Sequence, residues 1–317
     1  MKLIIQIPCY NEEKTLPITV SELPRKIEGI DIIETLIIDD GSTDRTIQVA
    51  REIDVDHIIS LNRNKGLANA FYIGIERCLE LGADIIVNTD GDNQYNGKDI
   101  PNLIQPVVNG FADVVIGDRQ ISKVKLFSFV KRKLQKIGSY VIRQLAQSEV
   151  IDTVSGFRAF SRDAAFRINI FTDFSYTVEN IIQLGNQKLK IVSVPIRVNE
   201  TLRESRLFSN IPQFLFNQLA TIIRVYSTYR ALRAFSILGG FFIAPGMFGL
   251  CRFLFFYYYY NDYGGHIQSL IISAVLINIG FLLLIFGVIA DLISNNRKLM
   301  EQTLYKIKTQ NQEKNNT

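Results

Sequence analysis

Residues 85–96 read IIVNTDGDNQYN, an apolar run followed at once by two carboxylates, Asp90 and Asp92, on either side of a glycine. The run predicts a short buried strand, and Gly91 allows a tight turn after it. Both carboxylates can then reach one hard cation such as Mg²⁺ or Mn²⁺, with Gln94 as a further oxygen ligand. The alternative is an ordinary surface turn, because Asp, Gly and Asn are common in turns.

Similar apolar runs recur along the first part of the chain, with helical spacing between them. The predicted strands are residues 3–7, 35–38, 57–61, 84–87 and 113–116, and the predicted helices include 43–53 and 67–81. This alternation predicts an α/β fold with a Rossmann-like, mostly parallel sheet and helices on both faces. Polar clusters follow the first four strands: PCYNEE, DDGSTD, NRNKG and DGDNQ. Because ligands bind at the carboxyl ends of parallel strands, these loops are expected to form one site.

The composition indicates a membrane segment besides this core. The chain has 317 residues, of which 47% are hydrophobic, and its mean hydropathy is +0.13. The apolar excess lies in residues 235–260 and 267–290, which the polar stretch 261–266 separates. At about 1.5 Å per helical residue, each run reaches roughly 36 Å and can cross a hydrocarbon core of ~30 Å. We predict a transmembrane hairpin over residues 234–291; the alternative is a hairpin buried in a soluble protein.

Charged residues set the expected orientation of the hairpin. Lys and Arg flank its outer ends and are absent from its connecting loop, which predicts that both termini and the N-terminal domain are cytoplasmic. Pro245 is a candidate kink, and Arg252 is expected to snorkel to the interface. Residues 292–317 form the expected cytoplasmic tail, whose polar part, residues 302–317, is expected to be a frayed helix or disordered. The hairpin is also a candidate surface for a homo-oligomer.

Five motifs together resemble the inverting family 2 glycosyltransferases of the GT-A fold: IPCYNEEKTLP, IIDDGSTDRT, NKGLANA, NTDGDNQYN and VSGFRAFSR. The similarity is strongest to the branch of dolichol-phosphate mannosyltransferases and other polyprenyl-phosphate glycosyltransferases. It covers residues 1–207, which we expect to form the catalytic domain. The resemblance implies a membrane-anchored enzyme that moves one sugar from a nucleotide-sugar to dolichyl or undecaprenyl phosphate with inversion.

The resemblance also implies roles for individual residues. The metal on the donor diphosphate would be held by Asp90, Asp92 and Gln94. The nucleotide-sugar would be bound by Pro8, Tyr10, Glu12 and Asp40, with Asp39 and Arg63 as further candidates. Four of these have structural alternatives: Asp39 and Asp40 as caps of the helix that begins near residue 43, with structural support also open for Asp39, Glu12 as a first-turn helix carboxylate, and Arg63 as a solvated loop residue. One departure is that the common DADLQHPP is here DGDNQYNGKD, without the His-Pro pair.

Positive charge is concentrated in two further stretches. Residues 119–143 carry eight Lys or Arg and no acid, interleaved with apolar residues. This pattern predicts a basic amphipathic helix at a membrane surface, with a solvated helix face as the alternative; nucleic acid is not expected as a partner. Residues 208–233 are expected to be a juxtamembrane amphipathic helix. The residues expected at the acceptor phosphate are Arg119, Lys133, Arg158, Arg203, Ser205 and Arg206.

The acceptor decides whether a general base is needed, because a phosphate monoester is already largely ionised at pH 7. If a base is used, Asp152 is the first candidate and Glu179 the second; each is equally an ordinary capping or paired carboxylate. The candidate catalytic residues are therefore Asp90, Asp92, Asp152, Arg203 and Arg206. Three other functions stay open: transfer to a glycolipid or saccharide hydroxyl, a processive polysaccharide synthase, which the absence of tryptophan disfavours, and a catalytically silent nucleotide-binding scaffold.

Overall fold

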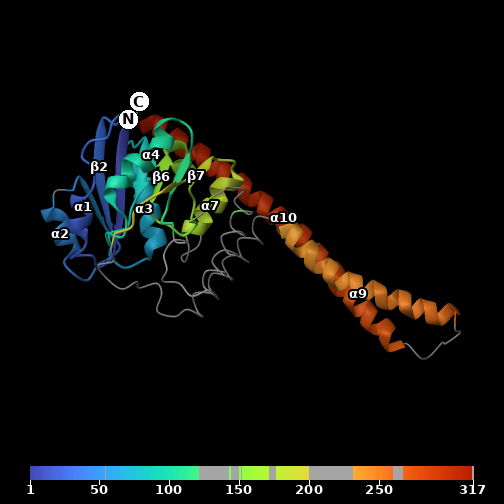
Figure 1. Ribbon diagram of the computed structural model, residues 1–317. Coiled ribbons are helices and arrows are strands. Elements are labelled where there is room, and N and C mark those ends of the chain that lie inside the picture. Colours follow the sequence, from blue (N-terminus) through green and yellow to red (C-terminus); the bar gives the residue numbers. More distant parts are fainter. Residues whose placement is uncertain are drawn as a thin grey trace. The chain divides into compact units, whose positions relative to one another are not determined.

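The structure is a computed structural model that describes residues 1–53, 55–120, 143, 150, 152–170, 176–199, 231–259 and 267–315. The chain divides into two units (Figure 1). One unit consists of Met1–Gln218 with Leu304–Thr317, and the other of Leu219–Thr303. The juxtamembrane helix predicted over residues 208–233 lies outside the described residues, except for its last three positions.

The first unit contains one sheet, and its described strands have the order β3-β2-β1-β4-β6-β5-β7 (Figure 1). The strands are β1 (Lys2–Cys9), β2 (Ile32–Asp39), β3 (His57–Ser60), β4 (Ile85–Asn88), β5 (Val114–Asp118), β6 (Arg158–Ser161) and β7 (Ile191–Pro195). Neighbouring strands are parallel, except that β6 is antiparallel to both β4 and β5. The predicted mostly parallel sheet is confirmed, and β6 is an addition that the sequence pattern does not predict.

Helices cover both faces of this sheet. They are α1 (Leu16–Ser21), α2 (Thr46–Glu52), α3 (Leu67–Glu80), α4 (Ile100–Val108), α6 (Arg162–Arg167) and α7 (Tyr176–Asn186), with a 3₁₀ turn at Gly97–Asp99. Side chains alternate along a strand, so β1 serves two cores. Leu3 and Ile5 pack in one buried cluster with residues of α1 and α4. Gln6, on the opposite face, lies against Gly74 of α3. The predicted placement of helices on both faces is confirmed.

The end of α10 (Ile267–Asn315) belongs to the first unit from Leu304 onward. Tyr305 donates a hydrogen bond to Asp163 Oδ1 at 2.7 Å, and its ring lies edge-on to Phe166 of α6. Lys308 Nζ donates to Glu76 Oε1 of α3 at 2.8 Å. Of the two expectations for the tail, a frayed helix or disorder, the one of disorder is therefore wrong. The helix continues to Asn315 and packs on α3 and α6.

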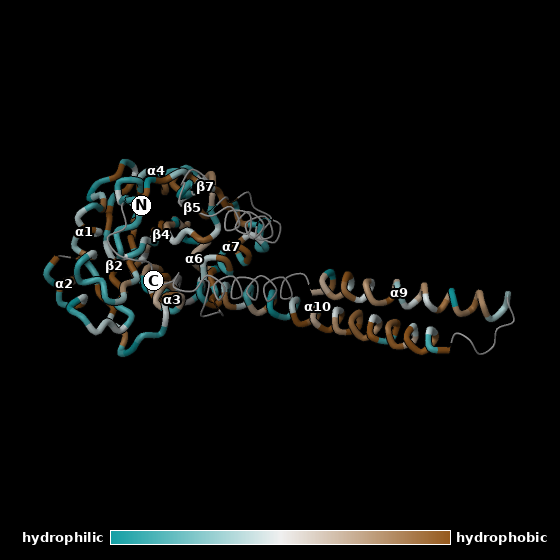
Figure 2. The backbone as a smooth tube through the Cα atoms, turned by 60° about the horizontal axis from the view of Figure 1, so that its bottom comes forward, coloured by the Kyte–Doolittle hydropathy of each residue, from teal (hydrophilic) through white to brown (hydrophobic). Residues whose placement is uncertain are grey.

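The second unit contains α9 (Ala231–Tyr259) and residues 267–303 of α10, and both helices are long and apolar enough to cross a membrane (Figure 2). Many of their large apolar side chains are exposed, such as Phe241 at 72% and Phe248 at 74%. A large exposed apolar surface is unfavourable in water, whereas lipid solvates it. This exposure favours the predicted transmembrane hairpin over a hairpin buried in a soluble protein. Helix α9 continues through Pro245.

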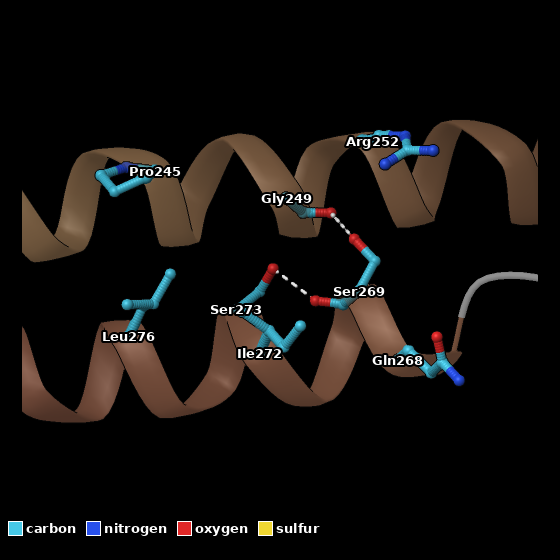
Figure 3. A pocket seen from close by; sticks show the side chains of 8 residues that line it. All are labelled: Pro245, Gly249, Arg252, Gln268, Ser269, Ile272, Ser273 and Leu276. Carbon is cyan, nitrogen blue, oxygen red and sulfur yellow. Dashed lines mark hydrogen bonds between the residues drawn. The ribbon is translucent and has the colours of Figure 1, made fainter.

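Polar side chains of the hairpin gather around a cleft of about 360 Å³ between the two helices, near the ends that the loop connects (Figure 3). The cleft is lined by Pro245, Gly249, Arg252, Gln268, Ser269, Ile272, Ser273 and Leu276. The hydroxyl of Ser273 donates to the carbonyl of Ser269 at 2.7 Å, so this polar group is satisfied within its own helix. Arg252 lies roughly 10 Å from the end of α9 at 1.5 Å per residue, within reach of the interface for a long side chain.

The two hairpin helices approach closely at glycines. A methyl group on Gly280 of α10 would lie 2.8 Å from the carbonyl oxygen of Gly239 on α9. Replacing Gly280 with leucine should therefore force the helices apart and destabilise the hairpin by about 1–3 kcal/mol. Thermal unfolding of the full chain in detergent measures this effect. Gly240→Leu is the matched control, because a methyl group at Gly240 meets nothing within 4 Å. Equal melting temperatures for the two variants would contradict the close packing.

Candidate active site

Four carboxylates surround the carboxyl end of β1. Burial raises the pKa of the Cys9 thiol well above its usual value, and the charges of Glu12, Asp39, Asp90 and Asp92 raise it further. These residues come from the loops after β1 and β4 and from the end of β2, which are neighbours in the sheet. The expected convergence of polar loops at one sheet edge is therefore seen for these three strands, and it makes that edge strongly acidic.

The loop after β4 approaches β1 through a glycine. A methyl group on Gly91 would lie 2.9 Å from Cys9 Sγ and 3.4 Å from Glu12 Cγ, so a larger residue would push the loop away. Asp92 Oδ1 accepts a hydrogen bond from the amide of Gln94 at 3.1 Å. Asn93 between them has a left-handed backbone with φ 56°. The turn therefore places Asp92 and Gln94 in one small loop beside the end of β1.

The chemistry of this loop fits a hard divalent cation. Asp90 and Asp92 offer carboxylate oxygens, and Gln94 offers an amide oxygen, which are the ligand types that Mg²⁺ and Mn²⁺ prefer. Within the described part of the chain, no group of three or more His, Cys, Asp or Glu side chains is arranged to enclose a metal. These residue types would provide a partial oxygen shell for such a cation. The assignment of these three residues to a metal stays a prediction.

The two aspartates at the end of β2 hold loops in place. Asp39 is fully buried and accepts hydrogen bonds from the Ser42 amide at 3.2 Å and from the Ser60 hydroxyl at 3.4 Å. Asp40 is 3% exposed and accepts from the amides of Lys65 and Gly66, both at 2.8 Å. Asp39 thus links the loop after β2 to the end of β3, and Asp40 shapes the loop after β3. Their contact with a nucleotide-sugar stays a prediction.

The other predicted nucleotide residues lie around the same edge. Pro8 is buried in β1, and Tyr10 is half-buried directly after it. Glu12 is 6% exposed and accepts from the Thr15 hydroxyl at 2.7 Å. Because α1 begins only at Leu16, the alternative of a first-turn helix carboxylate does not fit Glu12. Arg63 is an exposed loop residue, as its structural alternative describes.

Asp152, the first candidate for a general base, is paired with Arg119. Arg119 Nε donates to Asp152 Oδ2 at 2.7 Å, and its Nη2 donates to Oδ1 at 3.0 Å. Burial would lower the pKa of Arg119, but the hydrogen bonds and charge of Asp152, together with the charge of Asp90, raise it. A carboxylate whose two oxygens both accept from a guanidinium is poorly placed to accept a proton from a substrate. The second candidate, Glu179, is 3% exposed on α7.

Asp152→Asn should therefore weaken the fold and leave the pH dependence of catalysis unchanged. Breaking a buried ion pair costs about 3–5 kcal/mol, and we expect about 2 kcal/mol here because Arg119 is partly exposed. Thermal unfolding measures the loss, and kcat/KM between pH 6 and 9 measures the pH dependence. A general base would instead contribute roughly 10²–10⁴-fold to the rate. Loss of the acidic limb of the profile would show that Asp152 is the base.

Arg158 does not fit its predicted contact with the acceptor phosphate. It is fully buried, and its guanidinium donates to the carbonyls of Ser155 at 2.8 Å, Thr177 at 2.8 Å and Thr153 at 3.0 Å. Burial lowers its pKa to about 10, so it remains charged at neutral pH. Arg158 therefore joins the loop before β6 to the start of α7. The phosphate candidates Lys133, Arg203, Ser205 and Arg206 lie outside the described residues.

The structure adds residues that motif reasoning does not single out. Gln6, Asn88 and Tyr95 are buried polar residues, and each is hydrogen-bonded beside the loop of Asp90. The only sequence signal for them is at Tyr95, which stands where the common DADLQHPP has His.

Comparisons with known proteins identify the family. Residues 4–168, just over half of the chain, match the model described as Glycosyl transferase family 2. The chain therefore belongs to glycosyl transferase family 2 and is a glycosyltransferase. The UDP-N-acetylglucosamine–dolichyl-phosphate N-acetylglucosaminyltransferase of Methanococcus voltae is 31% identical, over 60% of this chain and 83% of that protein. The undecaprenyl-phosphate mannosyltransferase of Micrococcus luteus is 27% identical, over 67% and 89%.

The fold also matches a solved glycosyltransferase. Glucosyl-3-phosphoglycerate synthase of Mycobacterium tuberculosis, crystallised with Mn²⁺, UDP and phosphoglyceric acid, aligns with a TM-score of 0.55 and 18% identity. The alignment covers 71% of this chain and 78% of that one. At this identity the likeness shows the GT-A fold alone.

Proposed function

We propose that the protein transfers one sugar from a nucleotide-sugar to a polyprenyl phosphate at the cytoplasmic face of a membrane, with inversion. One observation carries this proposal: a single chain joins a glycosyl transferase family 2 domain to two helices that can span a membrane. A transferase held at a bilayer meets lipid acceptors first. The names of the relatives from Methanococcus voltae and Micrococcus luteus, which specify dolichyl phosphate and undecaprenyl phosphate, support the same acceptor class.

The acidic edge of the sheet would bind the donor. Asp90, Asp92 and Gln94 would hold Mg²⁺ or Mn²⁺, which when bound stabilises the charge that develops on the leaving diphosphate. The structural neighbour crystallised with Mn²⁺ and UDP supports this choice of metal. Tyr10, Glu12 and Asp40 would border the nucleotide. Asp39 and Asp40 would act mainly by fixing the loops that surround it.

The acceptor phosphate would need positive charge more than a base. A phosphate monoester with a second pKa near 6 is mostly ionised at neutral pH and can attack without losing a proton. The absence of a required base agrees with the ion pair between Asp152 and Arg119, because that pair engages the carboxylate of the first candidate base. The charge of Arg119 acts on Asp90, so this guanidinium brings positive charge to the acidic site. Arg119, Lys133, Arg203, Ser205 and Arg206 are the proposed phosphate contacts.

Both termini and the catalytic unit are proposed to face the cytoplasm. The distribution of Lys and Arg around the hairpin supports this orientation. The contacts of Tyr305 with Asp163 and of Lys308 with Glu76 are consistent with one shared side for the C-terminal end of α10 and the catalytic unit, while the choice of the cytoplasm rests on Lys and Arg alone. The hairpin remains a proposed surface for homo-oligomers.

The proposal is tested by incubating the purified full chain with Mn²⁺, radiolabelled UDP-, GDP- or dTDP-sugars and a polyprenyl phosphate. We expect one donor to give a labelled product that partitions into organic solvent and has the opposite anomeric configuration to the donor. Label that appears only in a saccharide or glycolipid supplied as a competing acceptor would reject the polyprenyl phosphate. Background rates with every donor and acceptor would favour a silent scaffold.

A further inference from the structure

Asp90 is packed against the backbone of Gly156, a glycine in the loop before β6. A methyl group on Gly156 would lie 3.0 and 3.1 Å from the two carboxylate oxygens of Asp90 and 3.3 Å from the hydroxyl of Tyr176. A larger residue at position 156 would therefore have to displace the Asp90 carboxylate by a few tenths of an ångström. The position of the Gly156 backbone sets how far the Asp90 carboxylate can move toward the loop.

Buried side chains bind both the amide and the carbonyl of Gly156. Its amide donates a hydrogen bond to the hydroxyl of Tyr95 at 2.9 Å, and its carbonyl accepts from Asn88 Nδ2 at 2.8 Å. Asn88 Oδ1 in turn accepts from Gln6 Nε2 of β1 at 2.9 Å. Gln6 and Asn88 are fully buried, and Tyr95 is 3% exposed. Water does not compete at this depth, so each bond fixes its partners firmly.

Tyr95 itself is rigid and belongs to the same loop as Asp90. Its ring stacks on Phe157 with centroids 5.2 Å apart and planes at 8°. Its backbone pairs with Val198 in an isolated antiparallel bridge. The loop after β4 thus contains both Asp90 and Tyr95, and Tyr95 holds the glycine that lies against Asp90.

We infer that Tyr95 is a positioning residue for the metal site, whose hydroxyl holds Gly156 against Asp90 and so fixes the Asp90 carboxylate in the orientation that binds a divalent cation. Outer groups that orient metal ligands typically change metal affinity or activity by about 10–100-fold when they are removed. The inference also accounts for the tyrosine at position 95, where the common family motif DADLQHPP has histidine, since the tyrosine hydroxyl reaches the Gly156 amide. It rests on the proposed function only in assigning Asp90 to the metal.

The test compares Tyr95→Phe with the wild-type chain. Phenylalanine keeps the ring stack on Phe157 and removes only the hydroxyl that accepts from Gly156. We expect Mn²⁺ affinity to fall about tenfold, as measured by the electron paramagnetic resonance signal of free Mn²⁺ during titration of the full chain. Raising Mn²⁺ should restore most of the turnover, a rescue that a merely structural role would not give. Tyr305→Phe is the matched control, because it also removes one hydroxyl hydrogen bond but lies on the α6 face.

A second variant keeps the inference testable if Tyr95→Phe folds poorly. Gly156→Ala adds a methyl group directly against the Asp90 oxygens and should also weaken Mn²⁺ binding about tenfold. Wild-type affinity in either folded variant, with Mn²⁺ binding lost in Asp92→Asn, would overturn the inference and leave the proposed function intact. If the wild type binds Mn²⁺ and Tyr95→Phe weakens it, yet no sugar reaches polyprenyl phosphate, the proposed function fails and the inference stands. No Mn²⁺ binding by the wild type would overturn the inference and the proposed metal site, whereas the labelled lipid product alone decides the proposed function.

Discussion

Asp92→Asn is expected to lower kcat about a thousandfold while the protein stays folded. Two unit charges 4 Å apart interact by about 4 kcal/mol at an effective dielectric near 20, and each 1.36 kcal/mol in the barrier changes the rate about tenfold. Asp92 would act through the divalent cation that it helps to hold, and losing the attraction between that cation and the leaving diphosphate should cost about this much. Asparagine has the same shape, and its Oδ1 can still accept from the Gln94 amide, so the turn should persist. Steady-state turnover at saturating Mn²⁺ and thermal unfolding measure the two effects.

The matched control for this substitution is Asp113→Asn. Asp113 is also a half-buried aspartate that accepts from a backbone amide, that of Lys190 at 2.8 Å, but it precedes β5 and so lies at the other end of the strands. It should lose little or no turnover. If Asp92→Asn keeps turnover within tenfold of the wild type, the leaving group is stabilised elsewhere and the proposed metal site is wrong.

The sheet was predictable because local patterns and the fold agree. Each of the first four strands is an apolar run that ends in polar loop residues, and a parallel sheet brings such ends together. Strand β6 lacks this signal: it is only four residues long and begins with the charged Arg158. Its place between β4 and β5 depends on pairing with residues far away in the sequence, which no local pattern encodes.

The roles within the site depend even more on distant contacts. Asp90 and Asp92 could be singled out because their spacing on a strand end is a local property. Asp152 was a candidate general base because the sequence does not reveal its ion-pair partner. That partner, Arg119, is 33 positions away. The tail from residue 302 looked disordered because its composition is polar, yet Tyr305 and Lys308 find partners on α6 and α3. Polarity in a sequence does not distinguish a solvated residue from one that is satisfied by tertiary contacts.

Arg158 is the clearest case, since an arginine in a loop motif of a glycosyltransferase suggests a phosphate ligand. Its side chain is instead a structural donor that satisfies three buried carbonyls, one of them 19 positions away in α7. A phosphate could bind Arg158 only if those carbonyls lost their donor. The structural role therefore predicts a large loss of stability on substitution, whereas the ligand role predicts a loss of acceptor affinity in a stable protein.

Arg158→Met should accordingly destabilise the protein by about 3–5 kcal/mol, because methionine fills similar space and leaves buried carbonyls without donors. At about 2–4 °C per kcal/mol for a unit of this size, the melting temperature should fall by roughly 10 °C. Arg162→Met is the control: Arg162 is half-buried, donates to the Ala83 carbonyl at 3.3 Å and lies 3.8 Å from an Asp84 oxygen at the surface, so a change below about 1 kcal/mol is expected. An Arg158→Met protein with wild-type stability but a raised KM for the lipid acceptor would restore the phosphate role. Destabilisation would instead show that Arg158 holds the loop that carries Gly156 next to Asp90.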